Sequence, residues 1–293
     1  MNYLYYPGCS LTGTAREYNQ STKAFLAGMG VQLTELTDWT CCGASAASAV
    51  SNRLTDALPA VNLAIAETMA DDPEVLVPCS ACYLNLKRVE MEVYGNPKRL
   101  EGVNVLLAET GLHLQGKSRP RHLLDVLARD VGADAIRQRL DHELSGLAIA
   151  PYYGCQCLRP YAVFDHPESP TSMEPLIEAT GATVHPWSEG AKCCGASHMN
   201  TKMPVALERV YRILKAARGA DAVVTVCPMC QMNLEAYQDK VASRYGEDLG
   251  ITILYLPQLL GMAIGLSHSE LGLPLNLAVT PGFQQKIRSA AGA

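Results

Sequence analysis

The pentapeptide Cys-Cys-Gly-Ala-Ser occupies residues 41–45 and returns letter for letter at residues 193–197 of this chain of 293 residues. A pattern that recurs at a long interval is the sign of an internal duplication. The two copies therefore fix how the first half of the sequence aligns with the second half.

Two further landmarks flank the pentapeptide and repeat with it. Tyr-Tyr-Pro-Gly-Cys at residues 5–9 matches Tyr-Tyr-Gly-Cys at residues 152–155. Val-Pro-Cys-Ser-Ala-Cys at residues 77–82 matches Val-Cys-Pro-Met-Cys at residues 226–230. All landmarks keep their order and are displaced by about 150 residues. The sequence predicts two homologous modules, the first ending in a helical linker, over residues 1–145 and 146–293.

Short apolar runs precede several of the cysteines, at residues 3–6, 75–77, 148–153 and 222–226. Each run predicts a buried strand, and helical periodicity separates the runs. Strands that alternate with helices form parallel sheets with right-handed crossovers. Each module is therefore predicted to be α/β, a small and mainly parallel sheet flanked by helices. Ligands of such sheets gather at the carboxyl ends of the strands, which is where the cysteines fall.

Charge and hydropathy narrow the class of protein. The net charge of −5 argues against a nucleic-acid partner held by phosphate contacts. No secretory leader is recognised, and Pro257 and Gln258 interrupt the apolar stretch at residues 251–266, which predicts core and no membrane span. We expect a cytoplasmic protein. In a reducing compartment, clustered cysteines favour metal or redox chemistry over disulfides.

Ten of the eleven cysteines form two matching groups. The first cysteine set is Cys9, Cys41, Cys42, Cys79 and Cys82. The second cysteine set is Cys155, Cys193, Cys194, Cys227 and Cys230. A tetrahedral zinc or a cubane cluster uses four ligands, and adjacent cysteines with Cα atoms about 3.8 Å apart are awkward ligands for one ion. Five thiols per set favour an iron–sulfur cluster of uncommon shape, while zinc in one or both modules and buried structural thiols remain alternatives.

Glycines accompany both sets. Gly8 and Gly154 precede the first cysteine of each set, and Gly43 and Gly195 follow each cysteine pair. Glycine admits positive φ and leaves room for close approach, so amide N–H groups can point at sulfur. Such hydrogen bonds raise the reduction potential of a cluster.

The paired pattern, with Tyr-Tyr-Pro-Gly-Cys-Ser-Leu and Tyr-Tyr-Gly-Cys, resembles the B subunit of heterodisulfide reductases, built from two CCG domains, over essentially the whole chain. The resemblance implies a non-cubane [4Fe–4S] cluster in each domain, held by the five cysteines of each set. It also implies electrons delivered by a ferredoxin-like C subunit from a flavin-containing A subunit. The implied reaction is reductive cleavage of a disulfide, CoM-S-S-CoB or an analogous one, between the two clusters.

Two other functions share this constellation. One is a subunit of a sulfur-oxidising heterodisulfide reductase-like complex that acts on sulfane or lipoate-bound sulfur. The other is a pure electron-relay CCG subunit of a quinone-linked oxidoreductase. No G-x-G-x-x-G loop follows a strand, so the chain is expected to exchange electrons through a partner.

Several residues outside the two sets are candidates for the site. His198 lies four residues after Cys194 and could donate a proton to a leaving thiolate. Arg16, Arg159 and Lys202 lie near cysteine segments and could clamp an anionic substrate, although ordinary solvated surface is the favoured explanation for each one alone.

Cys157 is the eleventh cysteine and has no counterpart in the first module. Three roles are open to it: a substitute for Cys155, a neighbour of the second cluster, or an inert thiol, which is favoured.

Residues 111–118 match G-x4-G-K-[ST], the phosphate-binding pattern. Bulky Leu112, His113 and Leu114 stand where the backbone has to curl, and Pro120 follows closely. The segment is therefore interpreted as a turn in the linking region and not as a nucleotide site.

Overall fold

The structure is a computed structural model that describes residues 1–290. The first module contains a four-stranded sheet in the order β2-β1-β3-β4, with every pairing parallel. Its strands are β1 (Asn2–Tyr5), β2 (Gln32–Glu35), β3 (Glu74–Val77) and β4 (Arg119–His122).

The second module repeats this topology as β6-β5-β7-β8, again fully parallel. Its strands are β5 (Ala148–Tyr152), β6 (Thr183–Val184), β7 (Ala222–Thr225) and β8 (Thr252–Tyr255). The predicted fold class, two α/β modules related by duplication, is confirmed. The exact module boundary at residue 145 stays a prediction.

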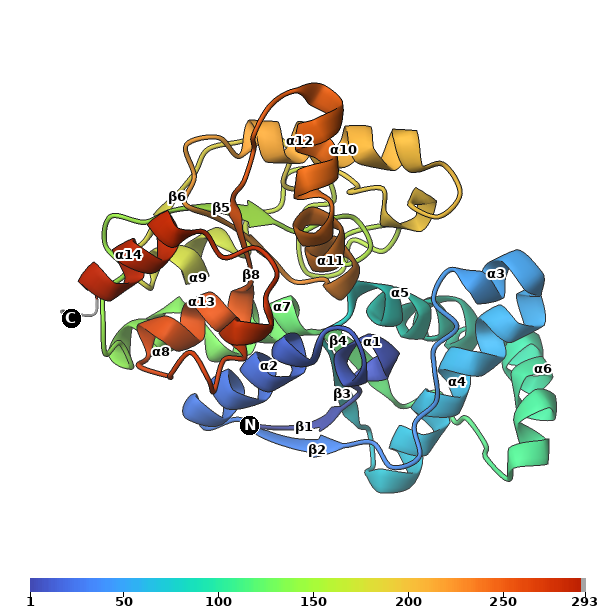
Figure 1. The fold of residues 1–293 in the computed structure, drawn as a ribbon. Coiled ribbons are helices and arrows are strands. Elements are labelled where there is room, and N and C mark those ends of the chain that lie inside the picture. Colours follow the sequence, from blue (N-terminus) through green and yellow to red (C-terminus); the bar gives the residue numbers. More distant parts are fainter. Residues whose placement is uncertain (291–293) are drawn as a thin grey trace.

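Helices cover both sheets (Figure 1). Those of the first module are α1 (Gly8–Thr12), α2 (Arg16–Gly28), α3 (Ala46–Val50), α4 (Asn52–Met69), α5 (Ser80–Val89), η1 (Glu90–Tyr94), α6 (Pro97–Leu107), η2 (Ala108–Thr110), α7 (Leu123–Val126), η3 (Leu127–Val131) and α8 (Ala133–Gln138). Those of the second are α9 (Glu174–Glu178), η4 (Ala196–His198), α10 (Met203–Ala216), α11 (Pro228–Ala236), α12 (Gln238–Tyr245), α13 (Leu256–Ala263), η5 (Leu273–Leu275) and α14 (Pro281–Ala290).

One hydrophobic cluster runs through both modules, and a second cluster lies within the second module alone. Helix α2 of the first module packs against α13 of the second, and the two lie side by side in Figure 1. Between them Tyr18 stacks on Tyr255. Buried side chains of both sheets belong to the same hydrophobic cluster. The relative position of the modules is therefore set by side-chain packing and not by a flexible linker.

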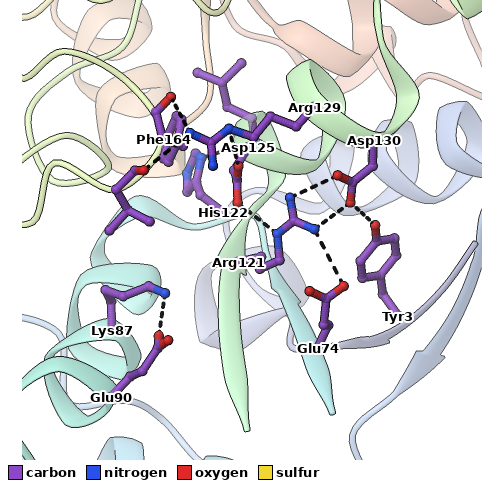
Figure 2. A network of polar contacts seen from close by, with 12 residues as sticks. Tyr3, Glu74, Lys87, Glu90, Arg121, His122, Asp125, Arg129, Asp130 and Phe164 are labelled. Atoms are coloured by element: carbon purple, nitrogen blue, oxygen red, sulfur yellow. Dashed lines mark hydrogen bonds and ion pairs between the residues drawn. The ribbon is translucent and has the colours of Figure 1, made fainter. Parts of the chain in front are cut away.

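A polar network reinforces the same interface (Figure 2). Arg129 on η3 donates from Nη2 to the carbonyl oxygens of Val163 and Phe164, at 3.3 and 3.2 Å, and these residues belong to the second module. The Asp125 carboxylate pairs with Arg129 and accepts from Nε of Arg121 at 2.8 Å. These contacts fix the loop that follows Cys157 against the first module.

Candidate functional site

The first cysteine set converges from three segments that follow the carboxyl ends of strands. Cys9 lies on α1 directly after β1, and Cys41 and Cys42 lie in the loop after β2. Cys79 is the N-cap residue of α5, which also carries Cys82. The sulfur atoms of Cys9 and Cys41 are 3.8 Å apart, and those of Cys42 and Cys82 are 3.4 Å apart. Segments more than thirty residues apart in the chain thus present their thiols together.

The second cysteine set is arranged in the same way. Cys227 is the N-cap residue of α11, and the sulfur of Cys230 on that helix lies 3.7 Å from the sulfur of Cys194. The Cys155 thiol is the largest influence that lowers the pKa of Cys193. In each set the second cysteine of the pair and both cysteines of the C-x2-C segment are buried, while the remaining two are exposed or half-buried.

Two asparagines hold the Cys-Cys-Gly loops in place. The Asn85 side-chain amide donates to the carbonyl oxygens of Cys42 and Ala44, at 3.2 and 2.9 Å. Asn233 donates to the carbonyl of Cys194 at 2.8 Å. The sequence shows both asparagines as part of the repeat, Asn85-Leu86 and Asn233-Leu234, but assigns neither a role. Each asparagine stands three residues after the last cysteine of its set, and this repeat is the signal that could have identified them.

Cysteine sulfur atoms lie close to the backbone at the two glycines that precede the first cysteine of each set, as the sequence predicts. Gly8 and Gly154 have φ of +67° and +71°. A Cβ atom at Gly8 would lie 2.8 Å from the sulfur of Cys82, and one at Gly154 would lie 3.0 Å from the sulfur of Cys230. Any larger residue at either position would therefore push a cysteine sulfur out of its place.

Hydrogen bonds stabilise thiolates within both sets. The pKa of Cys42 is lowered to about 3, first by the Cys41 thiol and then by the Cys82 thiol, with help from the Ala44 amide. The pKa of Cys193 is lowered to about 5, chiefly by the Cys155 thiol, and the charges of Arg209 and His198 act in the same direction. Each site therefore favours an anionic sulfur, which is the form that binds a metal.

The donor chemistry fits a thiolate-bound iron–sulfur cluster. Each site offers five thiols, backbone amides directed at sulfur (Ala44 to Cys42 at 3.5 Å, Gly195 to Cys193 at 3.3 Å) and buried surroundings. Within residues 1–290, no three His, Cys, Asp or Glu side chains gather around one point as ligands of a single ion. The ligands of a cluster sit on different irons and are spread more widely than those of a single ion.

A cavity of about 120 Å³ opens beside the second cysteine set. Its wall contains all five cysteines of that set. Residues of the first module complete the wall, namely Ala44, Ser45, Ser80 and Ala81. The second site is thus closed by side chains that come from the first module.

The other predicted site residues differ in their surroundings: three are exposed, and one is hydrogen-bonded to backbone carbonyls. His198 is exposed on η4, and its charge reaches Cys193. Arg16 and Lys202 are exposed at the starts of α2 and α10. Arg159 donates to the carbonyl oxygens of Pro167 and Ala191, so its guanidinium holds the surrounding loop together. The proton-donor role of His198 and the substrate roles of the other three residues stay predictions.

Arg209 and Cys157 also lie near the second set. Arg209 lies on α10, and its charge lowers the pKa of Cys193. The sequence did not point to this residue.

Cys157 is buried, and its thiol donates to the carbonyl of Tyr153 at 3.3 Å. Burial raises the pKa of Cys157 to about 12, so this thiol stays protonated beside the second set.

Comparison with known proteins shows the family to which this chain belongs. The profile of the cysteine-rich CCG domain family matches residues 3–87 and 149–235, so this chain is a member of that family with two copies of the domain. The B subunit of the ferredoxin:CoB-CoM heterodisulfide reductase of Methanosarcina mazei is 29% identical over 96% of this chain and 95% of its own. The predicted likeness to the B subunits of heterodisulfide reductases is confirmed.

Another relative has a different role. The 8-methylmenaquinol:fumarate reductase membrane anchor subunit of Wolinella succinogenes is 36% identical over 94% of this chain and 96% of its own. A crystal structure of a hypothetical protein from Helicobacter pylori matches with a TM-score of 0.75 and 17% identity, over 95% of this chain and 52% of that chain, which shows a common fold. Among residues 1–290 we find no helix long and apolar enough to cross a membrane.

Proposed function

We propose that this chain is the two-cluster subunit of an oxidoreductase complex and that it reductively cleaves a disulfide between two [4Fe–4S] clusters, one on each cysteine set. The main support is that two five-thiol sites, built alike, meet at one module interface. The segment with Cys79 touches the segment with Cys227 through the hydrogen bond from Ser80 to Val226, at 3.2 Å. Two adjacent one-electron sites match a reaction that consumes two electrons.

The chain's own residues prepare the second site for a sulfur substrate. The cavity wall includes Cys193, which is exposed, and the charges of His198 and Arg209 lie close to it. Positive charge there stabilises a thiolate as it forms, and His198 can supply its proton. When bound, the clusters supply the electrons for cleavage. Electrons would come from a ferredoxin-like C subunit and a flavin-containing A subunit in the same complex.

A pure electron relay is the second candidate function. It is supported by the 36% identity to a subunit of a quinol:fumarate reductase complex, since the name of that relative describes an anchor and no disulfide chemistry. In this case both cysteine sets would pass electrons between a quinol and another subunit, and the cavity would hold no substrate.

One assay separates the two functions. The anaerobically purified protein is reduced with a viologen radical and then mixed either with CoM-S-S-CoB or with a short-chain menaquinone. Disulfide reductase activity predicts oxidation of two viologen equivalents per CoM-S-S-CoB. Reoxidation by the menaquinone alone, with CoM-S-S-CoB left intact, would establish the relay and refute disulfide cleavage.

A further inference from the structure

Ser80 belongs to the first module, yet its side chain faces the second cysteine set. It is the first residue of α5, follows Cys79 directly, and is 1% exposed. Its Oγ donates to the carbonyl oxygen of Val226 at 3.2 Å, and the peptide of that carbonyl leads directly to Cys227. Ser80 also forms part of the wall of the cavity beside the second set. This hydrogen bond thus joins the two C-x2-C segments.

His122 fixes the direction of the Ser80 hydroxyl. The Leu124 amide donates to Nδ1 of His122 at 3.2 Å, so the ring proton has to sit on Nε2. Nε2 lies 3.2 Å from Oγ of Ser80 and donates to it, which leaves the hydroxyl proton free to point at Val226. Burial lowers the pKa of His122 to about 3, so the ring is neutral and keeps this arrangement at neutral pH.

Both modules hold the His122 ring. Phe164 of the second module stacks on it, with ring centroids 5.9 Å apart and planes 4° apart. Tyr83 of the first module meets it edge-on at 5.3 Å. Phe164 and His122 are both labelled in Figure 2. The hydrogen-bonded chain from His122 through Ser80 to Val226 is therefore a fixed part of the interface and is fully buried.

At the position equivalent to Ser80, the second module has no residue that could contact the first cysteine set in the way that Ser80 contacts the second. Pro228 takes the place of Ser80 after the first cysteine of the second C-x2-C segment. Proline has neither a hydroxyl nor a backbone N–H, so it cannot reach across to the first set in this way. The duplicated sites consequently differ in one interaction that crosses the interface.

We infer that Ser80 is a positioning residue for the second cysteine set, supplied by the first module and oriented by His122, and that it makes the reduction potential of the second site higher than it would otherwise be. Hydrogen bonds around ligand segments orient the ligands and tune the potential of a cluster. The Ser80 hydroxyl withdraws electron density from the peptide that ends at Cys227. This inference rests on the proposed presence of clusters on both sets.

The test compares three variants with the wild-type protein. Ser80→Ala removes the hydroxyl. Ser80→Thr keeps it. Ser45→Ala is the control, because Ser45 lines the same cavity from the first module, while its side chain forms no capping hydrogen bond at the start of α3. For each protein, iron content and the potentials of the cluster EPR signals are measured by anaerobic redox titration.

We expect equal iron content in all four proteins. In Ser80→Ala the potential of one cluster signal shifts to a more negative value and that of the other stays in place, whereas Ser45→Ala and Ser80→Thr match the wild type. Unchanged potentials in Ser80→Ala, or an equal shift in Ser45→Ala, would overturn the inference.

A second measurement separates this inference from the proposed function. Wild-type protein without iron would refute the function, but the contact itself can be examined in cluster-free protein by hydrogen–deuterium exchange. Amides of the segment 227–230 should exchange faster in Ser80→Ala than in Ser45→Ala. Equal exchange in the two variants would show that Ser80 does not hold the second set in place.

Discussion

Tyr18 of the first module stacks on Tyr255 of the second, with ring centroids 4.0 Å apart and planes 3° apart. Phe164 and His122 form the counterpart pair, because Phe164 follows Cys155 by the same nine residues that separate Tyr18 from Cys9, and His122 and Tyr255 each end the fourth strand of a sheet. The same ring-on-ring contact thus occurs twice across the interface, once from the first module to the second and once from the second to the first. The two contacts hold the cysteine sets together.

The Tyr18 ring should contribute more to the stability of this interface than the Tyr18 hydroxyl. Tyr18→Phe keeps the ring and loses the hydrogen bond from its hydroxyl to the carbonyl of Pro78, at 3.1 Å, which should lower the free energy of unfolding by about 1 kcal/mol. Tyr18→Ala leaves a cavity and should lower it by about 3 to 5 kcal/mol. Anaerobic urea unfolding measures both, and equal losses would show that the ring contributes little.

Asp125 should contribute far more than a surface carboxylate on the same part of the chain. Asp125 is buried and pairs with Arg121 and Arg129, so Asp125→Ala removes charge-assisted hydrogen bonds from a buried site and should cost about 2 to 3 kcal/mol of unfolding free energy, while Arg121 keeps its pairs with Asp130 and Glu74. The control is Asp134→Ala, which breaks an exposed pair with Arg137 and should cost less than about 1 kcal/mol. Similar urea midpoints for the two variants would contradict this role of the network in Figure 2.

Glu235 should make the protein less stable as pH rises. Burial raises the pKa of Glu235 from 4.5 to about 7, so between these values the folded protein binds a proton that the unfolded chain has released. Unfolding free energy should fall across this window, by up to about 3 kcal/mol, and Glu235→Gln should remove that part of the fall. Urea midpoints of both proteins are compared from pH 4.5 to pH 7; parallel curves would contradict the assignment.

Cys157→Ser and Cys155→Ser should behave differently although the residues are two positions apart. The Cys157 thiol is directed to the carbonyl of Tyr153, a contact that a serine hydroxyl can make. Cys157→Ser should therefore retain the wild-type iron content. Cys155→Ser removes a thiol of the second cysteine set and should lose iron from one site. Loss of iron in Cys157→Ser would instead make Cys157 a ligand.

Much of the fold can be predicted from the sequence because the core strands and the cysteines carry strong local patterns. Strand β4, Arg-Pro-Arg-His, escapes prediction, since its polar side chains are satisfied by tertiary partners such as Asp125 and Asp130 around Arg121. Strand β8 and helix α13 share one apolar stretch, whose hydropathy indicates core without showing where the strand ends and the helix begins.

The phosphate-loop pattern at residues 111–118 shows that a local pattern can also match a function that the tertiary structure does not support. Its interpretation as a turn fits the structure, in which the amides of Gln115, Lys117 and Ser118 donate to the carboxylate of Glu67, at 2.5, 2.6 and 3.0 Å. A side chain from α4 thus takes the acceptor position that a phosphate would need. No local pattern could reveal this partner, nor the contact of Ser80 with Val226.

Metal analysis of the anaerobically purified protein tests the central claim most directly, namely that both cysteine sets hold an iron–sulfur cluster. Iron, sulfide and zinc are measured in the wild type, in Cys42→Ser and in Cys194→Ser, with Cys157→Ser as the control. We predict about eight irons per wild-type chain and about half as many in Cys42→Ser and in Cys194→Ser. Zinc in place of iron, or iron content unaffected by Cys42→Ser and Cys194→Ser, would contradict it.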